Sequence, residues 1–154
     1  MKTAIIDFNR TLWNPDTNNL IPGAQELLQL LKGKEIKLAL ISAASDKKER
    51  QILIKSISSF FDVIKVVSEK SPQLFEEIIQ NFNTKPTETI VIGDRIKGEI
   101  NIGNRLGMKT IRLKAGKYAQ EEPLTKNENP NYSFTSLREI TTFLNETILR
   151  SERP

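Results

Sequence analysis

Two kinds of hydrophobic pattern alternate along the chain. Five short runs carry Ile, Val or Leu at nearly every position: 3–6, 36–41, 63–67, 89–92 and 110–113. Continuous apolar runs of this length are typical of strands that are covered on both faces. Between the runs, apolar residues recur at helical spacing, which indicates amphipathic helices. This alternation predicts a doubly wound parallel sheet with helices on both faces, a three-layer α/β/α architecture.

Capping residues predict where the helices begin and end. Apolar residues at positions 24, 27, 28 and 31 share one helical face, and Gly33 closes that helix. Ser45 predicts the start of a helix through about residue 57, and Ser71 followed by Pro72 predicts a helix through residue 82. Gly107 predicts the end of a fourth helix.

The last part of the chain begins with a long polar stretch. Residues 114–131 contain two prolines and no hydrophobic period, so we expect a flexible surface connection there. A short edge strand is predicted at 132–134, followed by an amphipathic helix with apolar residues at Leu137, Ile140, Phe143, Leu144 and Ile148. The pattern contains no internal repeat, and we expect one domain over residues 1–154.

Composition narrows the chemistry that this chain can perform. It contains neither histidine nor cysteine, which excludes His bases, His-ligated zinc and thiol nucleophiles from its own residues. Catalysis would rest on carboxylates, Lys, hydroxyls and oxygen-preferring cations such as Mg²⁺. The net charge of +4 is mild and mixed with acids, so no nucleic-acid partner is indicated. Without cysteine, a signal-like start or a bilayer-length apolar run, we expect a cytoplasmic protein with no membrane partner.

Polar side chains follow four of the predicted strands. Asp7 ends the first strand, Ser42 ends the second, and Lys70 follows the third just before a helix. Asp94 follows the fourth strand, and Glu99 comes five residues later. Because ligands of open α/β sheets bind beyond the carboxyl ends of the strands, these residues are candidates for one site.

In this order, the residues resemble the four motifs of the haloacid dehalogenase superfamily. The stretch DFNRT at residues 7–11 is similar to the first motif of its phosphatases, Asp-x-Asp-x-Thr, with one departure at Asn9. Ser42, Lys70 and the Gly-Asp pair at 93–94 with Glu99 match the other three motifs, and the resemblance covers roughly residues 2–115. It implies a single domain whose predicted strands lie in the order fifth, fourth, first, second, third.

The resemblance also implies roles for individual residues. Asp7 would be the nucleophile that forms an aspartyl-phosphate, and the catalytic set would be Asp7, Asn9, Ser42 and Lys70. The phosphate group would be bound by Ser42, Ala43, Lys70 and Arg10. The ligands of a Mg²⁺ ion would be Asp7, the backbone carbonyl of Asn9, Asp94 and Glu99.

Asn9 leaves three functions open. In the phosphatases of the superfamily the second acid protonates the leaving group, and an amide cannot do so. The leading interpretation is a Mg²⁺-dependent phosphate monoester hydrolase with low activity. The alternatives are a regulatory or binding protein that keeps the phosphate and metal pocket, and, less favoured, a dehalogenase.

The spacing between the motifs predicts that no cap domain is present. The segments from Asp7 to Ser42 and from Ser42 to Lys70 each leave room for one helix and one strand. An open site suits a phosphorylated macromolecule, a phosphorylated small molecule, or closure by a second copy of the chain in a homo-oligomer.

Overall fold

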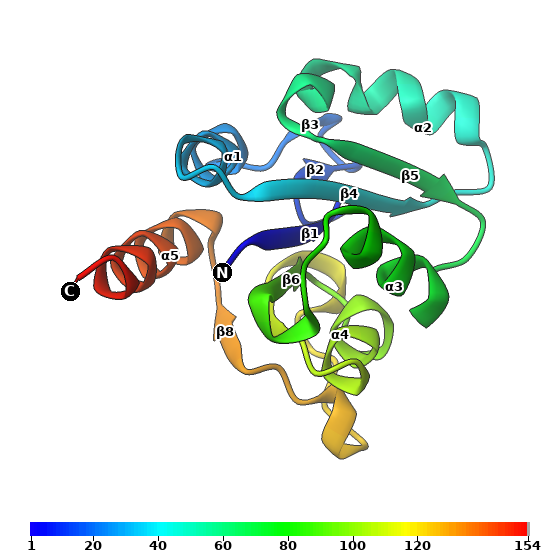
Figure 1. Ribbon diagram of the computed structural model, residues 1–154. Coiled ribbons are helices and arrows are strands. Elements are labelled where there is room, and N and C mark those ends of the chain that lie inside the picture. Colours follow the sequence, from blue (N-terminus) through cyan, green and yellow to red (C-terminus); the bar gives the residue numbers. More distant parts are fainter. Residues whose placement is uncertain (154) are drawn as a thin grey trace.

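Six parallel strands form the central sheet in the order β5-β4-β1-β6-β7-β8 (Figure 1). The structure is a computed structural model that describes residues 1–153. The strands are β1 (Thr3–Asp7), β4 (Lys37–Ala43), β5 (Val63–Val67), β6 (Thr89–Gly93), β7 (Lys109–Leu113) and β8 (Tyr132–Phe134). The predicted strand order is confirmed, and β8 is the predicted edge strand, paired in parallel with β7.

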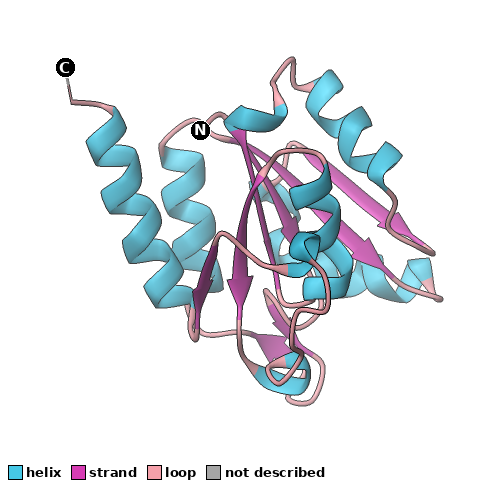
Figure 2. Ribbon diagram, turned by 90° about the horizontal axis from the view of Figure 1, so that it is seen from below, coloured by secondary structure: helices cyan, strands magenta, loops and turns pink. Residues whose placement is uncertain are grey.

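Helices cover both faces of this sheet, as the alternating pattern predicts (Figures 1 and 2). The α-helices are α1 (Ala24–Gly33), α2 (Lys47–Ile54), α3 (Pro72–Asn81), α4 (Asn101–Arg105) and α5 (Leu137–Ser151). Shorter helical turns are η1 (Lys55–Phe60), η2 (Pro86–Glu88), η3 (Ile96–Ile100), η4 (Gly116–Tyr118) and η5 (Lys126–Glu128). A small hairpin of β2 (Trp13–Asn14) and β3 (Asn19–Leu20) follows β1.

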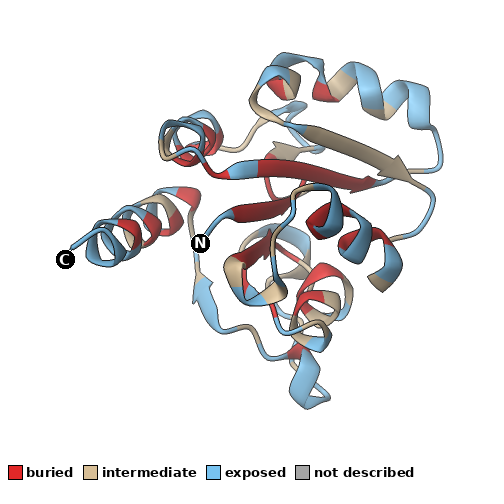
Figure 3. Cartoon of the chain, in the orientation of Figure 1, coloured by how far each residue is buried: buried red, intermediate tan, exposed pale blue. Residues whose placement is uncertain are grey.

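Two apolar cores lie on opposite faces of the sheet. In β1, Ile6 packs into a core shared with α1 and α5, whereas its neighbour Ile5 packs into a core shared with α3. Side chains of successive strand residues point to opposite faces, so a strand that is apolar at every position can serve both cores. Figure 3 shows the result, with β1, β4 and β6 buried along most of their length.

Helix ends differ from the sequence prediction at one cap. The side chain of Asp46, not Ser45, accepts a hydrogen bond from the backbone N–H of Glu49 at 3.1 Å and begins α2. Ser71 caps α3 as predicted, accepting from Leu74 N at 3.3 Å. Within residues 1–153, every helix is too short or too polar to span a bilayer.

Candidate active site

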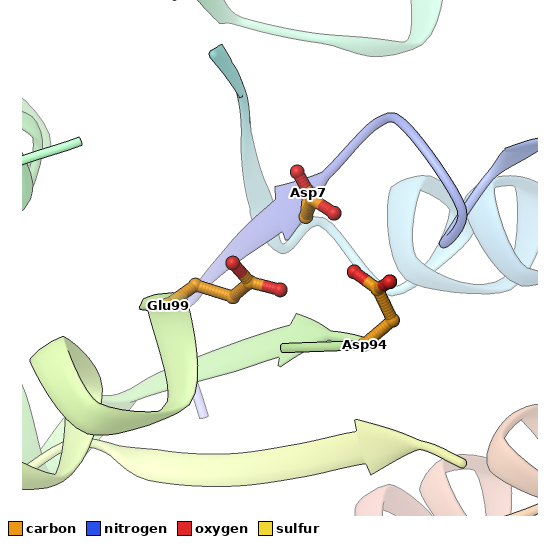
Figure 4. A group of neighbouring side chains, drawn as sticks. All are labelled: Asp7, Asp94 and Glu99. Atoms are coloured by element: carbon orange, nitrogen blue, oxygen red, sulfur yellow. The ribbon is translucent and has the colours of Figure 1, made fainter. Parts of the chain in front are cut away.

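The two central strands bring two carboxylates together at one edge of the sheet. Asp7 is the last residue of β1, and Asp94 directly follows the neighbouring strand β6. Both side chains are almost fully buried, with 6% and 2% of the residue exposed. Figure 4 shows their carboxylates projecting from the ends of adjacent strands into a common space.

Glu99 reaches the same space from the helical turn η3 (Figure 4). Each of Asp7, Asp94 and Glu99 offers one carboxylate oxygen, and these three oxygens lie within 4.8 Å of one another. Gly93 makes this approach possible, because a Cβ there would lie 2.1 Å from Glu99 Oε1. The glycine is therefore required by the close packing of the Glu99 side chain against the strand end.

Lys70 supplies the positive charge at this cluster. Its Nζ donates to Asp7 Oδ1 at 2.5 Å and to Glu99 Oε2 at 3.1 Å. Burial alone lowers the pKa of Lys70, but the charges of Asp7 and Glu99 outweigh it and raise the pKa above its ordinary value. Lys70 is placed here because the chain turns into α3 at the Ser71 cap immediately after it.

One carboxylate oxygen in the cluster has no partner. Asp94 Oδ2 is buried and forms no hydrogen bond within residues 1–153. Burial, followed by the charges of Asp7 and Glu99, raises the pKa of Asp94 to about 9, and burial likewise raises the pKa of Glu99. An unpartnered buried carboxylate beside two others fits a hard divalent cation, which satisfies such oxygens and offsets their repulsion.

Thr11 connects two of these acids, a role that the sequence reasoning did not assign. Its buried Oγ1 lies 3.0 Å from Asp7 Oδ2 and 3.4 Å from Asp94 Oδ1. The sequence feature that could have indicated this role is the position of Thr11 as the final residue of the DFNRT motif. Since Thr11 has one hydroxyl proton, it can donate fully to one acid at a time.

A cavity of about 550 Å³ opens above the cluster. Its lining includes Asp7, Asp94, Glu99 and Lys70 together with Asn9, Arg10 and Ala43. Arg10 holds a left-handed backbone conformation, with φ of 64°, and its Nη1 lies 3.2 Å from Asp16 Oδ2. Seven of the sequence-predicted site residues therefore meet at one cavity.

Ser42 is the one predicted site residue that does not line this cavity. It is fully buried near the end of β4, and its Oγ accepts a hydrogen bond from Arg50 Nη1. Arg50 also donates to the carbonyl of Ala43 at 3.2 Å, and its guanidinium lies over the Phe8 ring. The sequence reasoning missed Arg50, although its place one turn into α2, after the second motif, was a usable signal.

One residue of the connection after β7, Tyr118, also lines the cavity. The guanidinium of Arg95 lies 3.8 Å from the centre of the Tyr118 ring. Arg95 Nε also pairs with Glu121 Oε1 at 2.7 Å. Buried Arg112 donates through Nη2 to the carbonyls of Tyr118, Ala119 and Glu121. None of these contacts was foreseen, because no hydrophobic period marks the segment.

The sequence profile of the haloacid dehalogenase-like hydrolases matches residues 1–113, which span all the elements that carry the acid cluster. The chain belongs to this family.

Curated relatives of this haloacid dehalogenase-like hydrolase include phosphatases. The glyceraldehyde 3-phosphate phosphatase of Pyrococcus furiosus is 31% identical over 126 residues, which cover 78% of this chain and 52% of the relative. The protein of the same name from Methanopyrus kandleri is 30% identical over 126 residues, 77% of this chain and 54% of its own. The chain thus spans about half the length of these relatives, at 52% and 54%.

Solved structures of the family share the fold over nearly the whole chain. A haloacid dehalogenase-like family hydrolase from Xanthomonas campestris has a TM-score of 0.79 at 12% identity, covering 100% of this chain and 99% of its own. A phosphatase of the superfamily from Thermococcus onnurineus has a TM-score of 0.77 at 13% identity, covering 94% and 98%. At these identities the likeness concerns the fold alone.

Proposed function

We propose that this chain is a Mg²⁺-dependent phosphatase that hydrolyses phosphate monoesters through an aspartyl-phosphate on Asp7. The observation that carries the proposal is the convergence of Asp7, Asp94, Glu99 and Lys70 at the floor of one cavity. The names of the phosphatase relatives support the reaction class. The substrate is a phosphorylated small molecule or the phosphorylated part of a macromolecule.

Asp7, Asp94, Glu99 and the backbone carbonyl of Asn9 would hold the Mg²⁺ ion. When bound, the ion supplies positive charge that lets a carboxylate and an anionic phosphate approach each other. The unpartnered Asp94 Oδ2 supports this assignment, because an ion would satisfy an oxygen that the described protein atoms leave without a partner.

The chain's own residues would divide the reaction into two displacements. Asp7 forms a bond to phosphorus through one carboxylate oxygen while the ester oxygen leaves with its electron pair. Water then attacks the phosphorus, releases inorganic phosphate and restores the Asp7 carboxylate. Lys70, already 2.5 Å from Asp7 Oδ1, would bind a phosphoryl oxygen, and Ala43 and Arg10 would bind the phosphate at the cavity mouth.

Ser42 would act at this site only after a rearrangement. Its hydroxyl already accepts from Arg50 and lies beneath the lining of the cavity. The Ser42 assignment therefore needs Arg50 to release the hydroxyl, or Arg50 to bind the phosphate in its place.

A binding or regulatory protein with the same pocket is the second candidate, and Asn9 is the observation that favours it. Asn9 lines the cavity where a carboxylic acid would protonate the leaving group. The loss of a general acid–base typically costs about 10²–10⁴ in rate. Leaving groups that depart without a proton are therefore the best substrates of this chain.

Turnover of 4-nitrophenyl phosphate tests the proposed function. We expect hydrolysis that requires Mg²⁺ and is abolished in Asp7→Asn, because the amide removes the nucleophile and one acid of the cluster. Asp62→Asn removes a half-exposed acid outside the cluster and should retain the activity. Absence of Mg²⁺-dependent hydrolysis by the wild-type protein would favour the binding protein.

A further inference from the structure

Five cationic side chains line the cavity, and they differ in whether an acid neutralises them. They are Arg10, Lys70, Arg95, Lys97 and Arg105. The first three are ion-paired, with Asp16, with Asp7 and Glu99, and with Glu121, respectively. Within residues 1–153, Lys97 and Arg105 have no acidic partner. Two charges at the cavity are therefore available to a ligand.

These two residues lie on either side of a kink at Gly98, where the backbone departs from helical geometry. Lys97 belongs to η3 and Arg105 ends α4, with Asn101 midway between them. Asn101 and Arg105, four residues apart in α4, lie on the same side of that helix. Lys97 precedes the kink, and all three residues line the cavity. Four acids line the cavity: Asp7, Asp94 and Glu99 form the buried cluster, and Glu69 lies on the loop before α3.

We propose that Lys97, Asn101 and Arg105 form a second anion site, and that the substrate is a phosphate monoester carrying a second anionic group. This inference rests on the proposed function, which places the phosphate at Asp7. The second group is a carboxylate or another phosphate, held by two cations and the amide of Asn101. The substrate would extend from the acid cluster along the η3–α4 face, beside the wall formed by Arg95 and Tyr118.

The position of the second anion site on the cavity wall allows it to orient the substrate as well as to attract it. A single exposed cation adds little affinity, because water and salt screen it. Two cations and an amide on one wall of a cavity can instead bind one anion at several points and fix the ester's orientation. The selectivity of the site would then come from the η3–α4 segment itself.

Matched pairs of esters test the inference. 3-Phosphoglycerate and glycerol 3-phosphate differ only in a carboxylate replaced by a hydroxymethyl group, as do 6-phosphogluconate and sorbitol 6-phosphate. Fructose 1,6-bisphosphate with fructose 6-phosphate tests a second phosphate. Dissociation constants come from calorimetric titration of the wild-type protein in the presence of Mg²⁺. Calorimetry measures binding directly, so the comparison does not require a high rate of hydrolysis.

We expect at least one ester with the second anionic group to bind about tenfold to 100-fold more tightly than its matched ester without it. Lys97→Ala combined with Arg105→Ala should remove that preference. Both positions are exposed, so the double variant should fold. Lys109→Ala, an exposed cation at the start of β7 and outside this cavity, should retain the preference. A preference confined to the carboxylates or to the bisphosphate identifies the second group.

The outcomes separate this inference from the proposed function. Equal binding within every pair, or a preference that survives in the double variant, overturns the second anion site. Either result can occur while 4-nitrophenyl phosphate is still hydrolysed, which leaves the phosphatase proposal standing. A preference lost in the double variant of a protein without phosphatase activity supports the site and contradicts only the reaction.

Discussion

At the scale of single residues, Asn9 decides how fast the proposed reaction can run. Asn9 lines the cavity and stands two residues after Asp7, at the motif position where related phosphatases carry their second acid. Its amide can accept or donate a hydrogen bond but cannot transfer a proton to a leaving oxygen. The other parts of the proposed mechanism, the nucleophile Asp7, two further acids and a lysine, lie together in one cluster.

Asn9→Asp should therefore increase activity selectively. The two side chains are nearly equal in size, and the added carboxyl should raise kcat/KM for an alkyl phosphate by about 10²-fold or more. The gain for 4-nitrophenyl phosphate should be small, because nitrophenolate leaves without a proton. Steady-state kinetics with both esters measures this, and Asn19→Asp, on the exposed hairpin strand β3, controls for added charge. An equal gain with both esters, or no gain, would show that Asn9 is not a missing general acid.

The sequence predicted most of the clustered residues for a physical reason. Asp7, Lys70 and Asp94 lie at or just beyond the carboxyl ends of apolar strands, and parallel strands bring these ends to one edge of the sheet. Ser42 was predicted by the same rule, yet its hydroxyl is buried beneath Arg50. The Ser42 hydroxyl is bound by a long side chain from a neighbouring helix, Arg50 of α2. The apolar pattern of the strands does not predict this contact.

At the scale of elements, the connection after β7 forms part of the cavity wall. Residues 114–131 were predicted to be a flexible surface connection because they show no hydrophobic period. The structure holds them through polar contacts: Asn104 Nδ2 donates to the carbonyls of Asn127 and Asn129 at 2.7 Å each. Such contacts leave no periodic signal, so the sequence could predict the connection but not its attachment.

Arg112→Lys should loosen this wall. Arg112 is 3% exposed, and its Nη2 donates to three carbonyls of the segment 118–121. The lysine side chain ends one bond short of Nη2, so its ammonium would not reach these carbonyls in the same geometry. We expect a loss of about 2 kcal/mol in the free energy of unfolding. We also expect faster amide exchange in residues 116–121, and Arg138→Lys, at an exposed position of α5, provides the control. Unchanged exchange there would show that Arg112 does not hold the wall.

At the scale of the whole molecule, the fold buries ionisable side chains at the proposed active site. Three carboxyls and one lysine lie at the centre of the sheet edge, and the pKa of Asp94 is raised to about 9 because burial and its acidic neighbours disfavour the ionised form. The ion-free protein is therefore destabilised by its own site, whereas an ion that binds only the folded protein stabilises it. Apolar patterning predicted the sheet and helices that create this environment, but not the strength of the coupling among its charges.

Thermal unfolding with and without Mg²⁺, in the wild-type protein and in Asp94→Asn, tests this account most directly. At a Mg²⁺ concentration of about 100 times Kd, the wild-type Tm should rise by about 5–10 °C at constant ionic strength. Asp94→Asn should unfold at a higher temperature than the wild type without the ion, because it removes a buried carboxyl, and should not respond to Mg²⁺. Asp62→Asn should respond as the wild type does. A wild-type Tm that is indifferent to Mg²⁺, or an equal rise in Asp94→Asn, would contradict the proposal that the three buried acids form a Mg²⁺ site.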